Sequence, residues 1–428
     1  MPKDFDFRSI AVGAYGPSLL YGVATGAILP VIALTARDLG ADIATAALVI
    51  TLSGIGSLVT NVPATLIATL FGERKALVGA SLWCAAAMFL ALAAPTLPVF
   101  AAAVFMIGMA GAVFGLARQS YLTEVVPVQF RARALSTLGG VMRIGVFVGP
   151  FAAALAMGFL GLDGAYWVGG VACLAAAALS WQVPELEAGG RSPTSPISAR
   201  GAQGDPASPL SPSIPQLPLP TAPTVRSIMR SHRRVFLTLG IGVLLIAAVR
   251  ATRQAVLPLW AENIGLDAST TALVYGLSGA IDMLIFYPSG KIMDVKGRRW
   301  IAVPCMLIMG TALTLLPFTS EYVGLLLVAL LIGFGNGIGS GIVMTLGADL
   351  SPSPGRPQFL GVWRLLTDTG TMSGPALLAL VTAVATLSAG IWATAVLGFL
   401  GAGVLWWFIP RASSGPAPRT ASPPPQPG

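Results

Sequence analysis

The chain has 428 residues, of which 55% are hydrophobic and 10% are charged, and its net charge is +8. So few charged residues cannot solvate the surface of a soluble protein of this length, which argues against a soluble enzyme or a water-exposed helical bundle. Its three cysteines, Cys84, Cys173 and Cys305, show no metal-ligand spacing and imply neither a metal site nor a disulfide framework.

Apolar runs long enough to cross roughly 30 Å of hydrocarbon recur along the chain. We predict twelve membrane spans, at about 10–34, 43–71, 76–95, 98–124, 134–159, 164–183, 235–259, 269–291, 300–317, 322–348, 358–384 and 388–409. The fold class expected is therefore an all-α membrane protein with twelve transmembrane helices. Alternating glycines from Gly333 to Gly341 would suggest a strand in water, but an isolated strand in lipid leaves backbone groups unpaired, so a locally bent helix is expected there.

Residues 184–232 are rich in Pro and Ser and cannot bury a core, which predicts a disordered cytoplasmic linker. Residues 411–428 have the same composition and are predicted to form a disordered cytoplasmic tail. The two remaining parts, 1–183 and 233–410, are each predicted to form a bundle of six helices.

The basic residues lie almost entirely in loops on one side of the predicted membrane. With the N-terminus inside, Arg37 is the one basic residue outside, among acids such as Glu262 and Asp267. This asymmetry predicts cytoplasmic N- and C-termini in a multi-pass protein of the cell membrane. The positive charge thus orients the chain in its bilayer and implies no nucleic-acid partner. The excess of Arg over Lys, with abundant Ala and Gly, favours a bacterial inner membrane, and we expect a monomer.

The two halves repeat each other at a constant offset of 225 residues. Gly40 matches Gly265, Pro63 matches Pro288, and further positions such as Gly72 and Gly297 follow without drift. A constant offset indicates a duplicated unit with the same connectivity in each half. Two like-oriented units of about six helices, related by an axis along the membrane normal, are typical of one transporter architecture.

The loop between the eighth and ninth spans carries the clearest motif, GKIMDVKGRR at 290–299. It resembles the signature loop of the major facilitator superfamily, G-x-x-x-D-R-x-G-R-R, with Val295 where Arg is usual. In that family the loop locks and releases the two halves at the cytoplasmic side. The resemblance assigns gating roles to Gly290, Asp294, Gly297, Arg298 and Arg299. In the first half Thr69 replaces the acid, so we expect the gate to depend on the second copy.

Two further elements occur in both halves and support the resemblance. Glu124 with Arg131, and Asp349 with Arg356, fit the acid-x-x-P-x-x-x-R pattern of the family's cytoplasmic charge-relay segments. In the family these segments pair with the signature loops, so the resemblance assigns these four residues to the gate as well. A G-x-x-x-G-P element, similar to that of drug/proton antiporters in the superfamily, occurs twice, at Gly145, Gly149 and Pro150 and at Gly370, Gly374 and Pro375. A GxxxG pattern without proline would mostly indicate helix packing.

Ionisable groups inside the membrane are candidates for substrate or proton binding, since burying a charge there is costly. The predicted spans contain Arg118, Arg143, Arg250, Arg253, Asp282 and Asp368. At 1.5 Å per residue, Arg143 and Asp282 both lie about 13 Å from the cytoplasmic ends of their spans. The family packing brings those spans together, which predicts an Arg143–Asp282 ion pair when the cytoplasmic side is closed. The repeat places Asp368 toward Ser57 and Asn61. Structural ion pairs without a transport role are the alternative.

These observations predict a secondary active transporter of a small organic solute, working by alternating access, with proton-coupled efflux favoured. The excess of buried arginine fits an organic-anion uptake symporter as an alternative, and a transporter-like membrane sensor is a third possibility. The one histidine, His232, falls in the linker, so a coupling proton would have to bind Asp282 or Asp368. With no phosphate-binding loop and no catalytic constellation, we expect neither an enzyme nor a cofactor.

Overall fold

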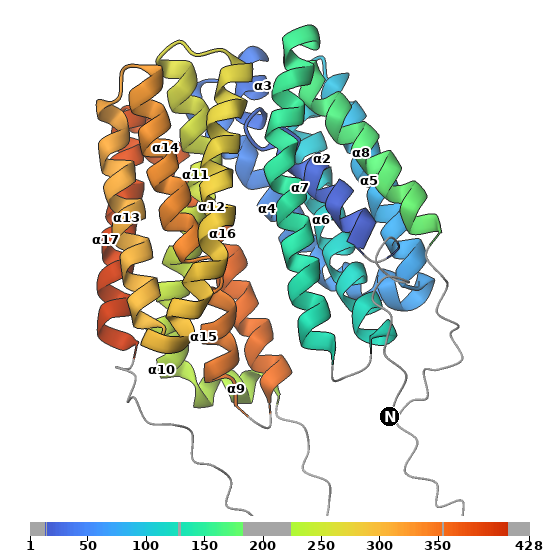
Figure 1. The fold of residues 1–428 in the computed structure, drawn as a ribbon, viewed down its shortest axis with the longest axis vertical. Coiled ribbons are helices and arrows are strands. Elements are labelled where there is room, and N and C mark those ends of the chain that lie inside the picture. Colours follow the sequence, from blue (N-terminus) through green and yellow to red (C-terminus); the bar gives the residue numbers. More distant parts are fainter. Residues whose placement is uncertain (1–12, 14, 127–129, 183–223, 353–354, 410–428) are drawn as a thin grey trace, which may run out of the picture.

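The computed structural model describes residues 13, 15–126, 130–182, 224–352 and 355–409. The first half is a bundle of helices (Figure 1). In chain order these are α2 (Gly16–Ile28), α3 (Ile32–Asp38), α4 (Ile43–Phe71), α5 (Glu73–Leu92), α6 (Leu97–Val125), α7 (Arg131–Leu160) and α8 (Asp163–Trp181).

The second half repeats this arrangement beside the first (Figure 1). It comprises α9 (Val225–Ser231), α10 (Arg233–Val235), the π-helical turn η4 (Phe236–Gly240), α11 (Ile241–Asn263), α12 (Ala268–Lys296), α13 (Arg299–Leu315), the 3₁₀ turn η5 (Leu316–Phe318), α14 (Tyr322–Ile338), α15 (Ile342–Leu350), α16 (Arg356–Val384) and α17 (Leu387–Phe408).

The helix lengths confirm the predicted fold class. Ten helices of the described residues are long and apolar enough to span a bilayer, and α2 with α3, bent by 41°, can form an eleventh span. The helix α16 has 29 residues but is more polar, because Arg364 and Asp368 lie within it. It packs against α4 and α11, so its polar groups can face protein rather than lipid.

Three predicted boundaries differ from the structure. The linker was predicted to extend to residue 232, but Val225–Ser231 form α9, because the Thr224 hydroxyl caps the helix and Ile228 is buried. The first span ends at Asp38 and is broken between α2 and α3. The tenth span is a helix, as expected, but it breaks at Gly339–Gly341, where the glycines favour a turn. Residues 183–223 and 410–428 lie outside the described part of the chain.

The ends of the helices confirm the repeat at the level of backbone geometry. Asp42 caps α4 by accepting a hydrogen bond from the backbone of Thr45 at 2.7 Å, and Asp267 caps α12 in the same way from Thr270 at 2.9 Å. Hydrogen bonds from the Thr45 side chain and backbone lower the pKa of Asp42, and those from the Thr270 backbone and side chain lower the pKa of Asp267. Gly72 and Gly297, at the other ends of these helices, have φ of 82° and 93°, which favours glycine.

The G-x-x-x-G-P elements lie where helices of the same half touch. A Cβ atom at Gly145 would lie 2.2 Å from the carbonyl oxygen of Leu19 in α2, and one at Gly370 would lie 2.3 Å from that of Leu244 in α11. Leu19 and Leu244 are themselves 225 residues apart, so the two contacts are equivalent. These glycines let α7 pack closely on α2, and α16 on α11.

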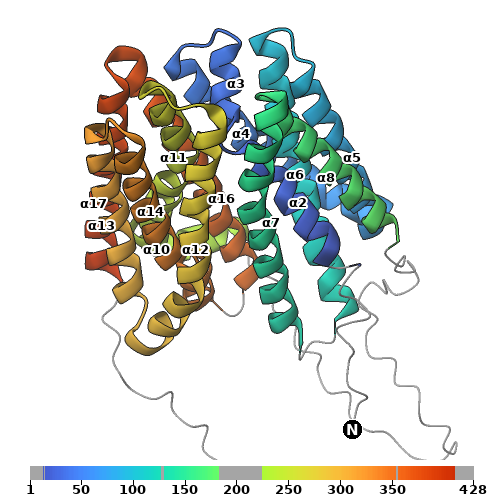
Figure 2. The same cartoon turned by 45° about the horizontal axis from the view of Figure 1, so that its top comes forward.

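The two halves meet along α7 with α12 and along α4 with α16. Contacts of α7 with α12 extend from Ser269, whose hydroxyl donates to the Ala154 carbonyl at 2.9 Å, to Arg143, which lies 4.3 Å from the centre of the Phe286 ring. From there the two helices diverge toward the end at which α7 begins (Figure 2). The halves are therefore closed together at the predicted outer end and apart at the predicted cytoplasmic end.

Candidate functional site

A polar cavity lies between the halves at mid-depth of the helices. It has one lobe of about 220 Å³ against α7 and α12 and another of about 400 Å³ toward α14 and α16. Three predicted site residues, Arg143, Arg250 and Arg253, line both lobes. Other polar or aromatic lining residues are Phe147, Asp282, Gln254, Tyr275, Asn336, Ser340, Thr367 and Thr371. The structure therefore brings together four of the six ionisable residues singled out from the sequence.

The carboxylate of Asp282 is held within the second half. It accepts a hydrogen bond from the Asn336 side-chain amide, and its Oδ2 lies 3.7 Å from Nη1 of Arg253. That separation is too long for a hydrogen bond. Arg253 is only 9% exposed, and both its Nη1 and the other Asp282 oxygen, Oδ1, are buried without a hydrogen-bond partner. Buried polar groups are normally satisfied, so these two atoms indicate a place for a ligand or water.

Arg143 reaches across from the first half. It donates to the hydroxyl of Ser340, and its guanidinium stacks on the ring of Phe286. Among the described residues Arg143 forms no direct ion pair with Asp282 in this open conformation, although both line the same lobe. The predicted Arg143–Asp282 pair concerns the closed cytoplasmic side, and it stays a prediction for that state.

The break in the tenth span supplies part of the cavity wall. The turn at Gly339–Gly341 frees the carbonyl of Gly339, which accepts from Arg250 Nη1 at 3.5 Å, while Arg250 Nε donates to Asn336 Oδ1 at 2.6 Å. Discontinuous helices of this kind form substrate sites in many transporters. Asn336 and Ser340 were missed in the sequence, because they are uncharged. Their place inside the glycine-rich run is the signal that could have indicated them.

The remaining ionisable residues lie apart from the cavity. As the repeat predicts, Asp368 contacts Asn61, whose amide donates to its Oδ2 at 3.1 Å across the α4–α16 interface. Its other partner is the exposed Arg364, at 3.8 Å. Arg118 is inside the first half, where it donates to the sulfur of Met142 while its Nε has no partner.

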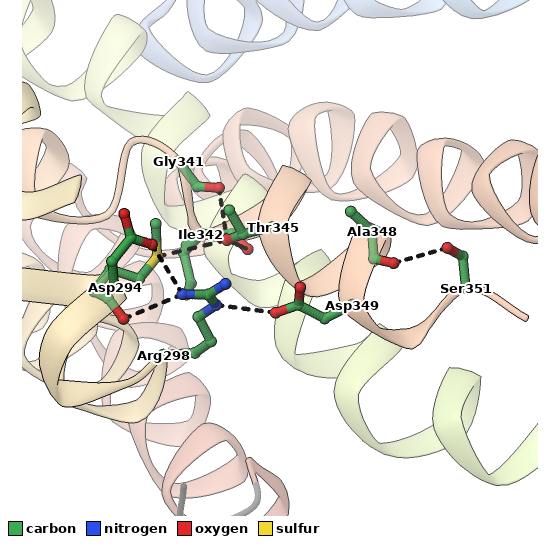
Figure 3. Close-up of polar contacts among 9 residues, drawn as sticks. Asp294, Arg298, Gly341, Ile342, Thr345, Ala348, Asp349 and Ser351 are labelled. Carbon is green, nitrogen blue, oxygen red and sulfur yellow. Dashed lines mark hydrogen bonds and ion pairs between the residues drawn. The ribbon is translucent and has the colours of Figure 1, made fainter. Parts of the chain in front are cut away.

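The signature loop forms a cluster of charges at the predicted cytoplasmic end of the second half (Figure 3). Arg298 bridges two acids, with its Nη1 3.3 Å from Asp294 and its Nε 2.9 Å from Asp349. The hydrogen bond with Asp349, and then the nearby negative charges, raise the pKa of Arg298. Arg299 lies 3.5 Å from the centre of the Trp406 ring of α17. Asp294 is 75% exposed and contacts only its own half among the described residues, which fits a released gate.

The first half has a different arrangement at the equivalent place. Position 73, which the repeat relates to Arg298, is the buried Glu73, and it accepts a hydrogen bond from Ser120 at 3.1 Å. Glu73 was not singled out in the sequence, because it follows a loop glycine like an ordinary surface residue. Glu124 and Arg356 are exposed, whereas the side chain of Arg131 and residue Pro127 lie outside the described residues. Among the described residues, the cluster of Arg298 with two acids lies in the second half, where the signature loop keeps its acid.

An ion pair between the halves closes the outer end. Arg37 in α3 lies 3.1 Å from Glu262 in α11, and its Nη1 also donates to the Ala41 carbonyl. The two partners are 225 residues apart, so they occupy equivalent positions of the repeat. Residues related by a twofold axis can touch only near that axis. The pair thus lies at the centre of the outer gate, and the opposite signs at one repeat position make the contact attractive.

Reversing one charge of this pair should open the outer end. Arg37→Glu places two carboxylates at the axis, and their repulsion should favour the outward-open state. Spin labels at Asp163 and Glu321, at the outer ends of the two bundles, should then show a longer mean distance. The double variant Arg37→Glu/Glu262→Arg should restore the shorter distance. An unchanged distance in the single variant would show that the pair does not hold the gate.

The fold, the cavity and the two ends together define a membrane transporter built from two six-helix repeats. The family model of the Major Facilitator Superfamily matches residues 18–353 and 239–427, and the chain belongs to this superfamily. Its members are secondary transporters and generally not enzymes. No curated protein matches the sequence at a significant level.

Solved structures of the same fold cover nearly the whole chain. A D-xylose-proton symporter is 16% identical, with 94% of this chain and 98% of that chain covered and a TM-score of 0.67. A bacterial homolog to the human lysosomal transporter Spinster, in an inward-facing and unoccupied conformation, is 13% identical, with 95% and 97% covered and a TM-score of 0.72. A POT family transporter in complex with 5-aminolevulinic acid is 11% identical, with 95% and 98% covered and a TM-score of 0.74. At such identities the likeness establishes the fold alone.

Proposed function

We propose that this protein moves a small organic anion across a bacterial inner membrane, coupled to protons, by alternating access between its two halves. The observation that supports this most is the cavity, where Arg143, Arg250 and Arg253 face a single carboxylate, Asp282. Arginine is the side chain best suited to bind carboxylate or phosphate groups, because its planar fork donates two parallel hydrogen bonds. The cytoplasmic placement of both termini, and hence of the open end, belongs to the same proposal.

The structure gives the expected efflux direction no separate support. The G-x-x-x-G-P elements pack α7 on α2 and α16 on α11 in equivalent ways, so they explain helix contact in both halves. A symmetric packing role argues for neither outward nor inward movement.

The test is a thermal-shift screen of the purified protein with small organic anions, neutral solutes and cations. Any stabilising compound is then followed by counterflow in proteoliposomes. Stabilisation by anions with counterflow of the same compound supports the proposal, and binding without flux would favour a membrane sensor. Stabilisation by cations or neutral solutes only would contradict the anionic substrate.

We expect the proton to bind Asp368. This carboxylate lies between the halves, and its one hydrogen bond crosses from α16 to Asn61 in α4, so its environment changes when the halves move. Asp368→Asn should retain counterflow, which needs no net driving force, but lose most of the accumulation that a pH gradient drives. The matched control Thr369→Ala, at the neighbouring exposed position of the same helix, should keep both. Loss of counterflow together with accumulation would assign Asp368 to another step.

A further inference from the structure

We infer that the substrate binds this cavity as a dianion, an anion that carries two negative charges. The inference rests on the proposed function, because it specifies the charge of the same anionic substrate. Its basis is the number of charges on the cavity wall rather than any single contact.

The described residues that line the two lobes include three arginines and one carboxylate. Asp282 lies against Arg253 and can balance one positive charge. Arg143 and Arg250 have neutral partners instead, namely Ser340 for the first and the Asn336 amide and Gly339 carbonyl for the second. Two positive charges therefore remain without a facing acid on the cavity wall.

No other carboxylate among the described residues is placed to balance them. Asp368 lies at the α4–α16 interface with Asn61 and Arg364, and it lines neither lobe. Glu73 and Asp294 lie at the helix ends toward the predicted cytoplasm. The further buried cation Arg118 only adds to the excess of positive charge.

The excess positive charge of the cavity matters most when the cavity closes during transport. In the open conformation water and small ions can screen Arg143 and Arg250. When both ends close around the substrate, the cavity loses this solvent, and each unbalanced charge in a medium of low dielectric becomes costly. A dianion leaves the closed cavity neutral, a monoanion leaves one positive charge, and a neutral solute leaves two. Closure itself therefore selects for the doubly charged substrate.

The cavity also restricts how the two charges are carried. Arg143 and Arg250 both line the smaller lobe of about 220 Å³, so the substrate must be a small molecule. A phosphate monoester carries both charges on one group, and a dicarboxylate carries them on two. Both share the required charge, and matched probes can distinguish them.

The experiment compares each dianion with its singly charged methyl ester. Methyl phosphate is compared with dimethyl phosphate, and succinate with monomethyl succinate, at pH 8 and constant ionic strength. At this pH a phosphate monoester is doubly charged, since its second pKa is about 6. The melting temperature of the purified full-length protein should rise by about 2 °C or more with at least one dianion and less with its ester.

Charge-matched variants make the result specific. In Arg250→Gln, which leaves one unbalanced charge, the preference should reverse toward the singly charged ester. In Arg364→Gln, where an exposed arginine outside the cavity is replaced, the preference for the dianion should persist. A loss of fold stability alone would weaken both probes equally and would not reverse their order.

Equal or better stabilisation by the singly charged esters in the unmodified protein would overturn the dianion and leave an organic-anion site in place. No stabilisation by any of the four anions would overturn the dianion and count against the proposed function as well. A larger effect of methyl phosphate would assign the phosphate class, and a larger effect of succinate the dicarboxylate class.

Discussion

Asp282→Ala and Arg253→Ala should each reduce transport by about tenfold or more and lower the free energy of unfolding by about 3 kcal/mol. Their side chains are only 17% and 11% exposed, and they lie 3.7 Å apart at their nearest charged atoms. Removing one partner leaves the other as an uncompensated charge in a place of low dielectric. The loss of the partner, rather than the strength of the pair, dominates this cost.

The double variant should therefore be less damaged than the sum of the two single variants. Thermal unfolding of the purified proteins measures stability, and counterflow with a compound from the screen measures function. The control is the pair of Arg364 with Asp368 in the same half, in which Arg364 is 60% exposed. Arg364→Ala should change stability little, because exposed ion pairs contribute little. Strictly additive effects of Asp282→Ala and Arg253→Ala would show that the two groups do not compensate each other.

The predicted Arg143–Asp282 pair can be tested by the same cycle. In the open conformation Arg143 donates to Ser340 and does not pair with Asp282. We therefore expect little coupling of Arg143 with Asp282 in thermal stability but clear coupling in transport, which passes through the cytoplasm-closed state. Additivity in both measurements would exclude the pair.

Asp294→Asn should reduce transport severely and leave the melting temperature nearly unchanged. In the open conformation its carboxylate is 75% exposed and its ion pair is with Arg298, four residues away on the chain. Such a contact contributes little to stability. We expect Asp294 to act in the closed state, because the resemblance to the family signature loop implies that this residue locks the two halves together.

Two matched variants separate this role from general damage to the charge cluster. Thr69→Ala, at the equivalent position of the first half, should retain most transport, since the hydroxyl of Thr69, which donates to the Leu66 carbonyl at 2.9 Å, carries no negative charge. Asp349→Asn removes the shorter hydrogen bond of Arg298, at 2.9 Å, and leaves the acid of the signature loop itself in place (Figure 3). If Asp349→Asn impairs transport as much as Asp294→Asn, the cluster acts as a structural brace rather than a gate. Equal losses of transport in Asp294→Asn and Thr69→Ala, at equal membrane abundance, would contradict the expectation that the gate depends on the second half more than on the first.

Much of the architecture is determined by the sequence alone. The spans follow from the length of the apolar runs, because backbone groups in lipid must be satisfied within each helix. The repeat predicts contacts as well, since a constant offset implies that a contact in one half has an equivalent in the other. Asp368 and Phe286 are the repeat counterparts of Arg143 and Asn61. The repeat correctly places Asp368 near Asn61, just as Arg143 lies near Phe286. It also relates the glycine contacts of α7 and α16.

The tertiary structure alone decided which charges meet. Hydropathy and spacing give the depth of a residue in the membrane, but not the rotation of its helix or the rotamer of its side chain. Asp282 therefore lies against Arg253 and Asn336 of its own half, while Arg143 reaches Ser340. The Arg37–Glu262 contact likewise depends on how closely the ends of α3 and α11 approach the axis. The repeat shows that positions 37 and 262 are equivalent, and only the packing of the two halves shows that their side chains touch.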